Sequence, residues 1–150
     1  MTARSNGAPG HVTGSWKLQR VDPARMKILA LLLDDPNPVH LDPEAARRLH
    51  IADREVNQGP SNMAMVVNML MQTWPDAELR QLRVRLLGQV LADDSVEAFG
   101  DVVQSSEFEE DGTQFQRLTV QFMLSVNFRG TVAAGEAQLV RRVNPTDYVG

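Results

Sequence analysis

Residues 35–42 (DPNPVHLD) carry a carboxylate and an imidazole five positions apart, at Asp35 and His40. Pro36 and Pro38 disfavour helix at the residues that precede them, so we expect an extended and stiff backbone here. A stiff loop can hold an acid and a base within reach of one water molecule. Such a pair can remove one proton from the water and return another. Addition of water across an activated double bond requires both transfers.

The same residues also have a purely structural interpretation. Asp35 and Asn37 could be capping or Asx-turn residues, and His40 could be a loop histidine whose hydrogen bonds are satisfied. Spacing alone leaves both interpretations open.

The composition is that of one ordinary globular domain. The chain has 150 residues, 43% of them apolar, and a net charge of −4, so it carries no basic footprint for nucleic acid or anionic lipid. Without cysteine there are no disulfides, zinc–thiolate sites or cysteine nucleophiles, and the three histidines (His11, His40 and His50) are too scattered for a metal site. No apolar stretch approaches the ~20 residues that span a bilayer. We expect a cytoplasmic protein with a flexible leader at 1–15 and one domain at 16–150.

Helical spacing predominates in the first half of the chain. Two Asp-Pro pairs, at 22–23 and 42–43, place an N-cap before a proline at the first helical position. They predict short helices over about 23–33 and 43–50, on either side of the Asp–His loop. The sequence therefore places the candidate pair between two short helices.

A long third helix is expected after Gly59-Pro60, with Ser61 or Asn62 as its cap, and it should end before Pro75. Two methionines, Met65 and Met69, flank its apolar stripe. A helix that is apolar nearly all round is usually buried by partners on several sides. The stripe consists of Met63, Val66, Val67, Leu70, Met71 and Trp74.

Alternating apolar and polar residues predict strands in the rest of the chain. Turns are expected at 111–112 and 129–130, with the acidic stretch 107–111 as a solvated hairpin tip. About five long antiparallel strands curved around a buried helix make an α+β architecture. The predicted strands are 12–20, 82–86, 96–102, 118–128 and 132–143.

The motif Asp35-x-Asn37-Pro38-x-His40 resembles the signature of MaoC-like dehydratases and (R)-specific enoyl-CoA hydratases. The resemblance spans about residues 16–143, and its further matching segments follow in the same order. These segments are Leu41-Asp42, Gln58-Gly59, residues 83–86, Asn127-x-x-Gly130 and Gly135-x-Ala137. The family has the hot-dog fold, in which a long antiparallel sheet wraps a central helix, as the periodicity also indicates.

The resemblance implies a role for four residues. Asp35 would be the catalytic carboxylate and His40 its partner, and together they would activate the water that adds to C3 of a trans-2-enoyl thioester. Asn37 would help to order the loop and this water. The backbone N–H of Gly59 would stabilise the thioester oxygen, a role that suits the unpaired N–H groups at a helix N-terminus.

The chain departs from the family pattern at three positions. Asp34 stands where a small residue is usual, Gln58 where a histidine is common, and Val67, beside Asn68, where the family often has a serine. Met63, Val67 and Asn68 are candidates for the pocket lining. Outward-facing arginines on the predicted strands could contact coenzyme A phosphates, although most are expected to be ordinary surface residues. These are Arg80, Arg83, Arg85, Arg129, Arg141 and Arg142.

The resemblance therefore implies a lyase of fatty acid or lipid metabolism that acts on acyl-CoA, needs no cofactor besides its substrate, and holds no metal. Two alternatives stay open, a non-catalytic subunit of a hetero-oligomeric hydratase and a hot-dog acyl-CoA thioesterase. We expect a homodimer or higher oligomer, with a hetero-oligomer also possible, because a sheet of about five strands leaves edges that invite pairing. No nucleic-acid or membrane partner is expected.

Overall fold

The computed structural model describes residues 13–143. It has the α+β architecture that the sequence predicts, with a sheet of five strands and one long helix. In chain order the elements are β1 (Thr13–Leu18), α1 (Pro23–Leu32), the single-turn 3-10 helix η1 (Pro38–His40), α2 (Pro43–Arg48), α3 (Gly59–Thr73), β2 (Glu78–Leu86), β3 (Val96–Glu110), β4 (Thr113–Val126) and β5 (Gly130–Arg142). Within 13–143 the structure contains no helix with the length and apolarity needed to cross a membrane.

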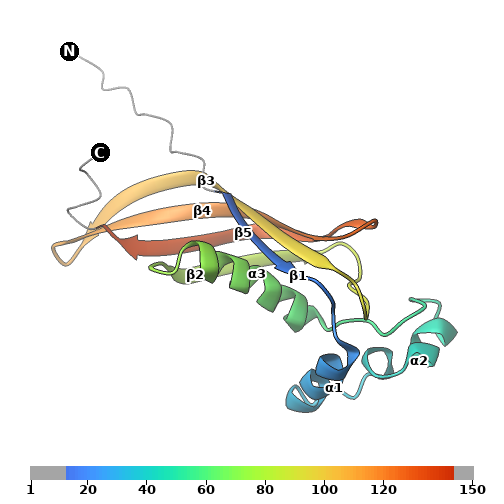
Figure 1. The fold of residues 1–150 in the computed structure, drawn as a ribbon. Coiled ribbons are helices and arrows are strands. Elements are labelled where there is room, and N and C mark those ends of the chain that lie inside the picture. The colour runs from blue at the N-terminus through green and yellow to red at the C-terminus, as the bar shows by residue number, and fades with distance from the viewer. Residues whose placement is uncertain (1–12, 144–150) are drawn as a thin grey trace.

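The strands form one antiparallel sheet in the order β1-β3-β4-β5-β2. The three central strands are consecutive in the chain and joined by tight turns, whereas both edge strands come from earlier in the chain. The sheet arches over α3, and α1 and α2 lie together near one end of that helix (Figure 1). The loop between α1 and α2 is therefore at the same end of the molecule as the start of α3.

The predicted strands are all present, and three of them start or end well beyond the predicted bounds. β2 already begins at Glu78 instead of residue 82. β3 continues to Glu110 and β4 already begins at Thr113, because the far part of this hairpin has exposed residues on both faces and so lacks the alternation. The acidic residues 107–110 pair with β4 there, next to the turn at Asp111 and Gly112. The solvated hairpin tip predicted from the sequence is confirmed.

The start of the domain requires a correction. Residues 13–15 belong to β1 and pair with β3, so the boundary expected after residue 15 lies too late. These residues are held in a strand by backbone pairing with β3, and their polar side chains give no sign of this in the sequence. The rest of the expected leader (1–12), His11 and the first residue of the predicted strand 12–20 lie outside the described residues.

The cap predicted for α3 is also corrected. The helix begins at Gly59 with Gln58 as its N-cap, instead of Ser61 or Asn62. Its buried residues are Asn62, Met65, Val66, Met69 and Leu70. Met65 and Met69 therefore belong to the buried face, while Met63 is 38% exposed. The sheet covers only one side of α3, so of the apolar residues all round the helix only those on the covered side are buried in the core.

One glycine allows the close approach of β5 and the edge strand β2. A Cβ at Gly135 would lie 1.9 Å from the carbonyl oxygen of Arg83 and 2.7 Å from Cζ of Phe122. A backbone carbonyl cannot move aside as a flexible side chain can, so any larger residue must push the two strands apart.

We predict that Gly135→Ala lowers the free energy of unfolding by about 1–3 kcal/mol or more, because the methyl group overpacks a backbone contact. Urea denaturation of the purified variant measures the change. The matched control is Gly88→Ala, since a Cβ at Gly88 would meet Val132 at an ordinary 3.4 Å. Equal stability of the two variants would show that the close approach is unimportant.

Candidate active site

The candidate loop begins with the C-terminal cap of α1. Asp34 has a φ of 50°, in the left-handed region. Its N–H donates to the carbonyl of Leu31 (3.3 Å), and the N–H of Asp35 donates to that of Ala30 (2.9 Å). This is a Schellman motif, in which glycine usually occupies the left-handed position and aspartate is among the few residues that tolerate it. Asp34 therefore ends the helix and sets the direction in which Asp35 leaves it.

The two carboxyl oxygens of Asp35 have different neighbours. Oδ1 accepts a hydrogen bond from the N–H of Asn37 (3.2 Å), and Oδ2 lies 3.4 Å from Nε2 of His40. Asn37 in turn caps η1, because its Oδ1 accepts from the N–H of Val39 (3.2 Å). The capping interpretation is thus confirmed for both residues, yet it engages only one oxygen of Asp35.

The hydrogen bond of His40 identifies its tautomer. Nδ1 lies 2.6 Å from the carbonyl oxygen of Val56. A carbonyl oxygen can only accept, so Nδ1 carries the proton and Nε2 of the neutral ring presents a lone pair. The side chain is only 13% exposed, and its ring is fixed at one nitrogen while the other faces Asp35.

In this state neither Nε2 of His40 nor the Asp35 carboxylate has a proton to donate to the other. Their separation of 3.4 Å is also longer than an ordinary N–H···O hydrogen bond. A water molecule that donates to both would satisfy them. The geometry thus suits an acid–base pair that shares one water.

The start of α3 lies directly after the segment that binds His40, since Val56 precedes Gly59 by three residues. Gly59 is the first residue of α3, so its N–H has no acceptor within the helix. Gln58 anchors this end, because its Nε2 donates to the carbonyl of Met26 in α1 (2.9 Å). Its Oε1 is buried without a hydrogen-bond partner among the described residues.

Two buried asparagines complete the anchoring of this helix end. Nδ2 of Asn57 donates to Oδ1 of Asn62 across the first turn of α3 (2.7 Å), and both residues are about 95% buried. The sequence predicts Asn62 only as a helix cap and gives no role to Asn57. Several polar residues do occur together at the start of this helix, but the sequence does not reveal which of them are buried.

A cavity of about 800 Å³ lies between the end of β1, α1 and the first half of α3. Asn57 and Asn68 contribute polar groups, and Lys17 and Arg25 also line it. Of the predicted pocket residues only Asn68 takes part, while Val67 is half-buried and Met63 exposed, and neither lines this cavity. Its apolar lining includes Met26, Ile28, Leu29, Leu32, Ala64 and Met65.

The candidate arginines do not gather at one place. Arg80, Arg129 and Arg141 form ion pairs with Glu78, Asp94 and Asp76. Arg83 and Arg85 line a hollow of about 650 Å³ over β2–β5 that also contains Asp101 and Glu136. Within 13–143 there is no group of three or more acidic or histidine side chains able to hold a metal ion.

Comparison with known proteins identifies the family. Residues 5–122 match the family described as MaoC like domain. No curated protein matches the chain in a sequence comparison.

Solved structures show the same fold at low sequence identity. The MaoC-like dehydratase from Rhodospirillum rubrum superposes with a TM-score of 0.76 at 19% identity, covering 93% of this chain and 95% of that one. The (R)-hydratase from A. caviae, involved in PHA biosynthesis, gives 0.67 at 23% identity, with 93% and 98% covered.

The ChsH1–ChsH2 complex from Mycobacterium tuberculosis gives a TM-score of 0.69 at 22% identity, covering 85% of this chain and 93% of that one. Members of the family thus occur in complexes of two different subunits. With its hot-dog fold and a match over residues 5–122, the chain belongs to the MaoC-like family of hydratases and dehydratases.

Proposed function

We propose that this protein adds water to a trans-2-enoyl-CoA thioester, or removes it from the corresponding 3-hydroxyacyl-CoA. The observation that carries the proposal is the arrangement of Asp35 and His40, whose Oδ2 and Nε2 atoms face each other at 3.4 Å. The Nδ1–H of His40 is held by the Val56 carbonyl, which leaves Nε2 as the proton acceptor. A single water beside the two acceptors, within hydrogen-bond distance of each, can be oriented by both and deprotonated by one.

The proposed reaction conserves atoms and charge. Nε2 of His40 takes a proton from the shared water while the water oxygen bonds to C3, and the C2–C3 π electrons move toward the thioester oxygen. The resulting imidazolium is stabilised by the Asp35 carboxylate and then returns a proton to C2. The Asp–His pair ends the cycle in its starting state, so no cofactor is consumed.

The thioester oxygen gains negative charge in this step and needs a donor. We propose the N–H of Gly59, at the positive end of α3, for that role. One such donor can contribute about 3 kcal/mol at the transition state. Anchoring of this helix end by Gln58 and Asn57 supports the proposal, because a preorganised donor needs no rearrangement during the reaction.

Crotonyl-CoA separates this proposal from the two alternatives. Loss of the enoyl thioester absorbance without release of free thiol indicates hydration, and loss of absorbance with release of free thiol indicates a thioesterase. Absence of both with a panel of enoyl-CoA substrates favours the non-catalytic subunit.

One prediction concerns the Asp35–His40 pair itself. Asp35→Asn and His40→Ala should each reduce kcat by ~10²-fold or more, because His40→Ala removes the group that transfers the protons and Asp35→Asn removes the carboxylate that orients the water and stabilises the imidazolium. The double variant should be little worse than either single one, since the two groups act as a unit. Hydration of crotonyl-CoA is followed by absorbance.

Each variant has a matched control nearby in the chain, Asp34 directly before Asp35 and His50 just after α2. Asp34→Asn changes the neighbouring exposed carboxylate, and His50→Asn changes an exposed histidine, both at left-handed positions that asparagine tolerates. Both controls should keep near-normal turnover. Normal turnover by Asp35→Asn would remove the basis of the assignment.

A second proposal is that two copies of the chain associate through the free edge of the sheet. β2 pairs with β5 on one side only. It ends at Leu86, and Leu86 and the following Leu87 are 55% and 53% exposed. Unpaired backbone groups next to apolar side chains form a surface that a second strand can complete.

We predict a dimer by light scattering at micromolar concentration, and dissociation by the double substitution Leu86→Asp and Leu87→Asp, which places charge on the proposed contact. Met123→Asp is the control, because Met123 is similarly exposed (49%) but lies in the central strand β4, which is paired on both sides at this position, with Phe99 of β3 and Ala134 of β5. A monomeric wild-type protein would refute this proposal.

Another prediction concerns the acyl chain of the substrate. We propose that the cavity of about 800 Å³ takes it, because Leu32 and Asn57 of its lining are close in sequence to Asp35 and Val56. The unbranched Met26 and Met65 can repack around different chains. The kcat/KM over a series of trans-2-enoyl-CoA lengths should therefore stay flat or rise beyond four carbons.

Two substitutions in α3 test this location. Ala64→Phe fills part of the cavity and should selectively reduce kcat/KM for long chains, whereas Gln72→Phe, on an exposed position outside the lining, should not. A wild-type profile that peaks at four carbons and collapses by eight would contradict a roomy pocket.

A further inference from the structure

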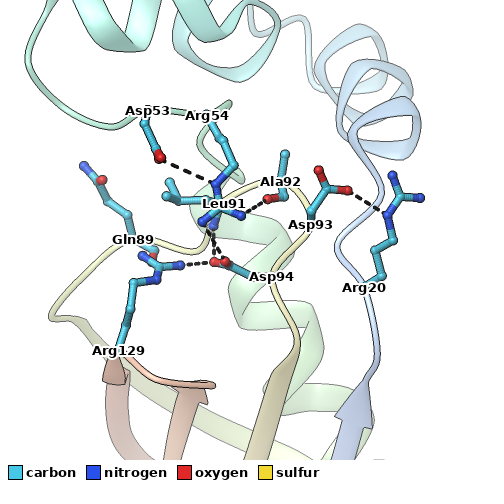
Figure 2. A network of polar contacts seen from close by, with 9 residues as sticks. All are labelled: Arg20, Asp53, Arg54, Gln89, Leu91, Ala92, Asp93, Asp94 and Arg129. Atoms are coloured by element: carbon cyan, nitrogen blue, oxygen red, sulfur yellow. Dashed lines mark hydrogen bonds and ion pairs between the residues drawn. The ribbon is translucent and has the colours of Figure 1, made fainter.

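Asp94 is a buried carboxylate distant in sequence from the candidate pair. Its side chain is 5% exposed and lies between the guanidinium groups of Arg54 and Arg129 (Figure 2). Oδ1 accepts from Arg54 (3.2 Å), and Oδ2 accepts from Arg129 and from the backbone N–H of Leu91 (2.6 Å). A buried charge is tolerated only when it is paired and hydrogen-bonded, so all three donors matter.

Both arginines also hold the backbone of the loop that contains Asp94. Arg54 donates to the carbonyl of Ala92 (2.6 Å), and Arg129 donates to that of Gln89 (3.1 Å). Arg54 precedes α3, and Arg129 lies in the turn between β4 and β5. One carboxylate thus joins three separate parts of the chain at residues 89–94.

This loop supports the segment that binds His40. The N–H of Asn57 donates to the carbonyl of Val90 (2.8 Å), and the N–H of Ala92 donates to that of Glu55 (2.9 Å). On the other side, Val56 donates its N–H to the carbonyl of Val39 (2.9 Å) and accepts the Nδ1–H of His40 (2.6 Å). Residues 55–57 are therefore held between the Asp94 loop and the candidate site.

We propose that Asp94, with Arg54 and Arg129, is a positioning cluster for His40. The cluster holds the loop at 89–94, the loop holds residues 55–57, and the Val56 carbonyl holds the Nδ1–H tautomer of His40. Its consequence for turnover rests on the proposed hydratase function. Its consequence for the tautomer is a property of the protein alone.

The test variant is Asp94→Asn, which keeps the shape of the side chain but removes the buried carboxylate that Arg54 and Arg129 share. Arg54 then keeps only its ion pair with the exposed Asp53 (3.5 Å). Asp93→Asn is the matched control. Asp93 is the adjacent residue and also pairs with an arginine, Arg20 (2.7 Å), but their side chains are 51% and 60% exposed and this pair lies outside the hydrogen bonds that join the loop at 89–94 to residues 55–57 (Figure 2).

The first measurement is ¹⁵N NMR of the histidine rings at a mildly alkaline pH, where imidazole is neutral. The His40 signals are assigned by their loss in His40→Ala. Wild type and Asp93→Asn should show the Nδ1–H tautomer of His40, and Asp94→Asn should shift toward a mixture of tautomers. A general loss of stability would not change the tautomer within the folded population.

The second measurement is steady-state hydration of the enoyl-CoA that wild type accepts. We expect Asp94→Asn to lower kcat about tenfold or more with little change in KM, because a misplaced base affects the reaction more than substrate binding. If wild type hydrates no enoyl-CoA, the proposed function fails while the NMR result still decides the positioning role.

Arg129→Gln keeps the proposal testable if Asp94→Asn does not fold, since Arg129 is 36% exposed and more easily replaced. It should change the His40 tautomer in the same direction, and Arg129→Lys should restore part of the wild-type signature. A folded Asp94→Asn or Arg129→Gln protein with wild-type His40 signals would overturn the proposal.

Discussion

A sheet of five strands covers only one side of α3, and this constraint governs the rest of the structure. Met65, Val66, Met69 and Leu70 are its buried apolar residues and belong to the core. The other side of the helix must be covered by something else, and α1 does so only around its first half. The cavity of about 800 Å³ lies where this second cover is incomplete. The space available for a substrate is thus a consequence of one-sided burial.

Features that depend on near neighbours in the sequence were predictable. The Asp-Pro helix starts, the alternating strands and the hairpin turn at Asp111 and Gly112 all rest on local preferences. The buried face of α3 was predicted less well, because apolar residues occur nearly all round this helix. Only contact with the sheet distinguishes Met65 from Met63.

The candidate site shows the same division. The positions of Asp35 and His40 on a stiff loop follow from the sequence, as do the capping bonds of Asn37. The hydrogen bond from His40 to the Val56 carbonyl and the contacts of the Asp94 cluster could not be predicted. They join residues far apart in the chain, and several of them use backbone groups that every residue has. Local capping and long-range orientation act together here, so the structural and chemical interpretations of the loop are compatible.

The strand order gives the site a particular dependence on the complete chain. β3, β4 and β5 form a continuous meander that is local in sequence, whereas β1 and β2 reach their places only by pairing with strands far along the chain. In the sequence, the Asp–His loop lies between these two edge strands, and the loop at 89–94 that supports it leads into β3. A fragment that contains only the first half of the chain or only the meander therefore lacks part of the site or of its support, which makes the site a property of the complete domain and not of a transferable motif.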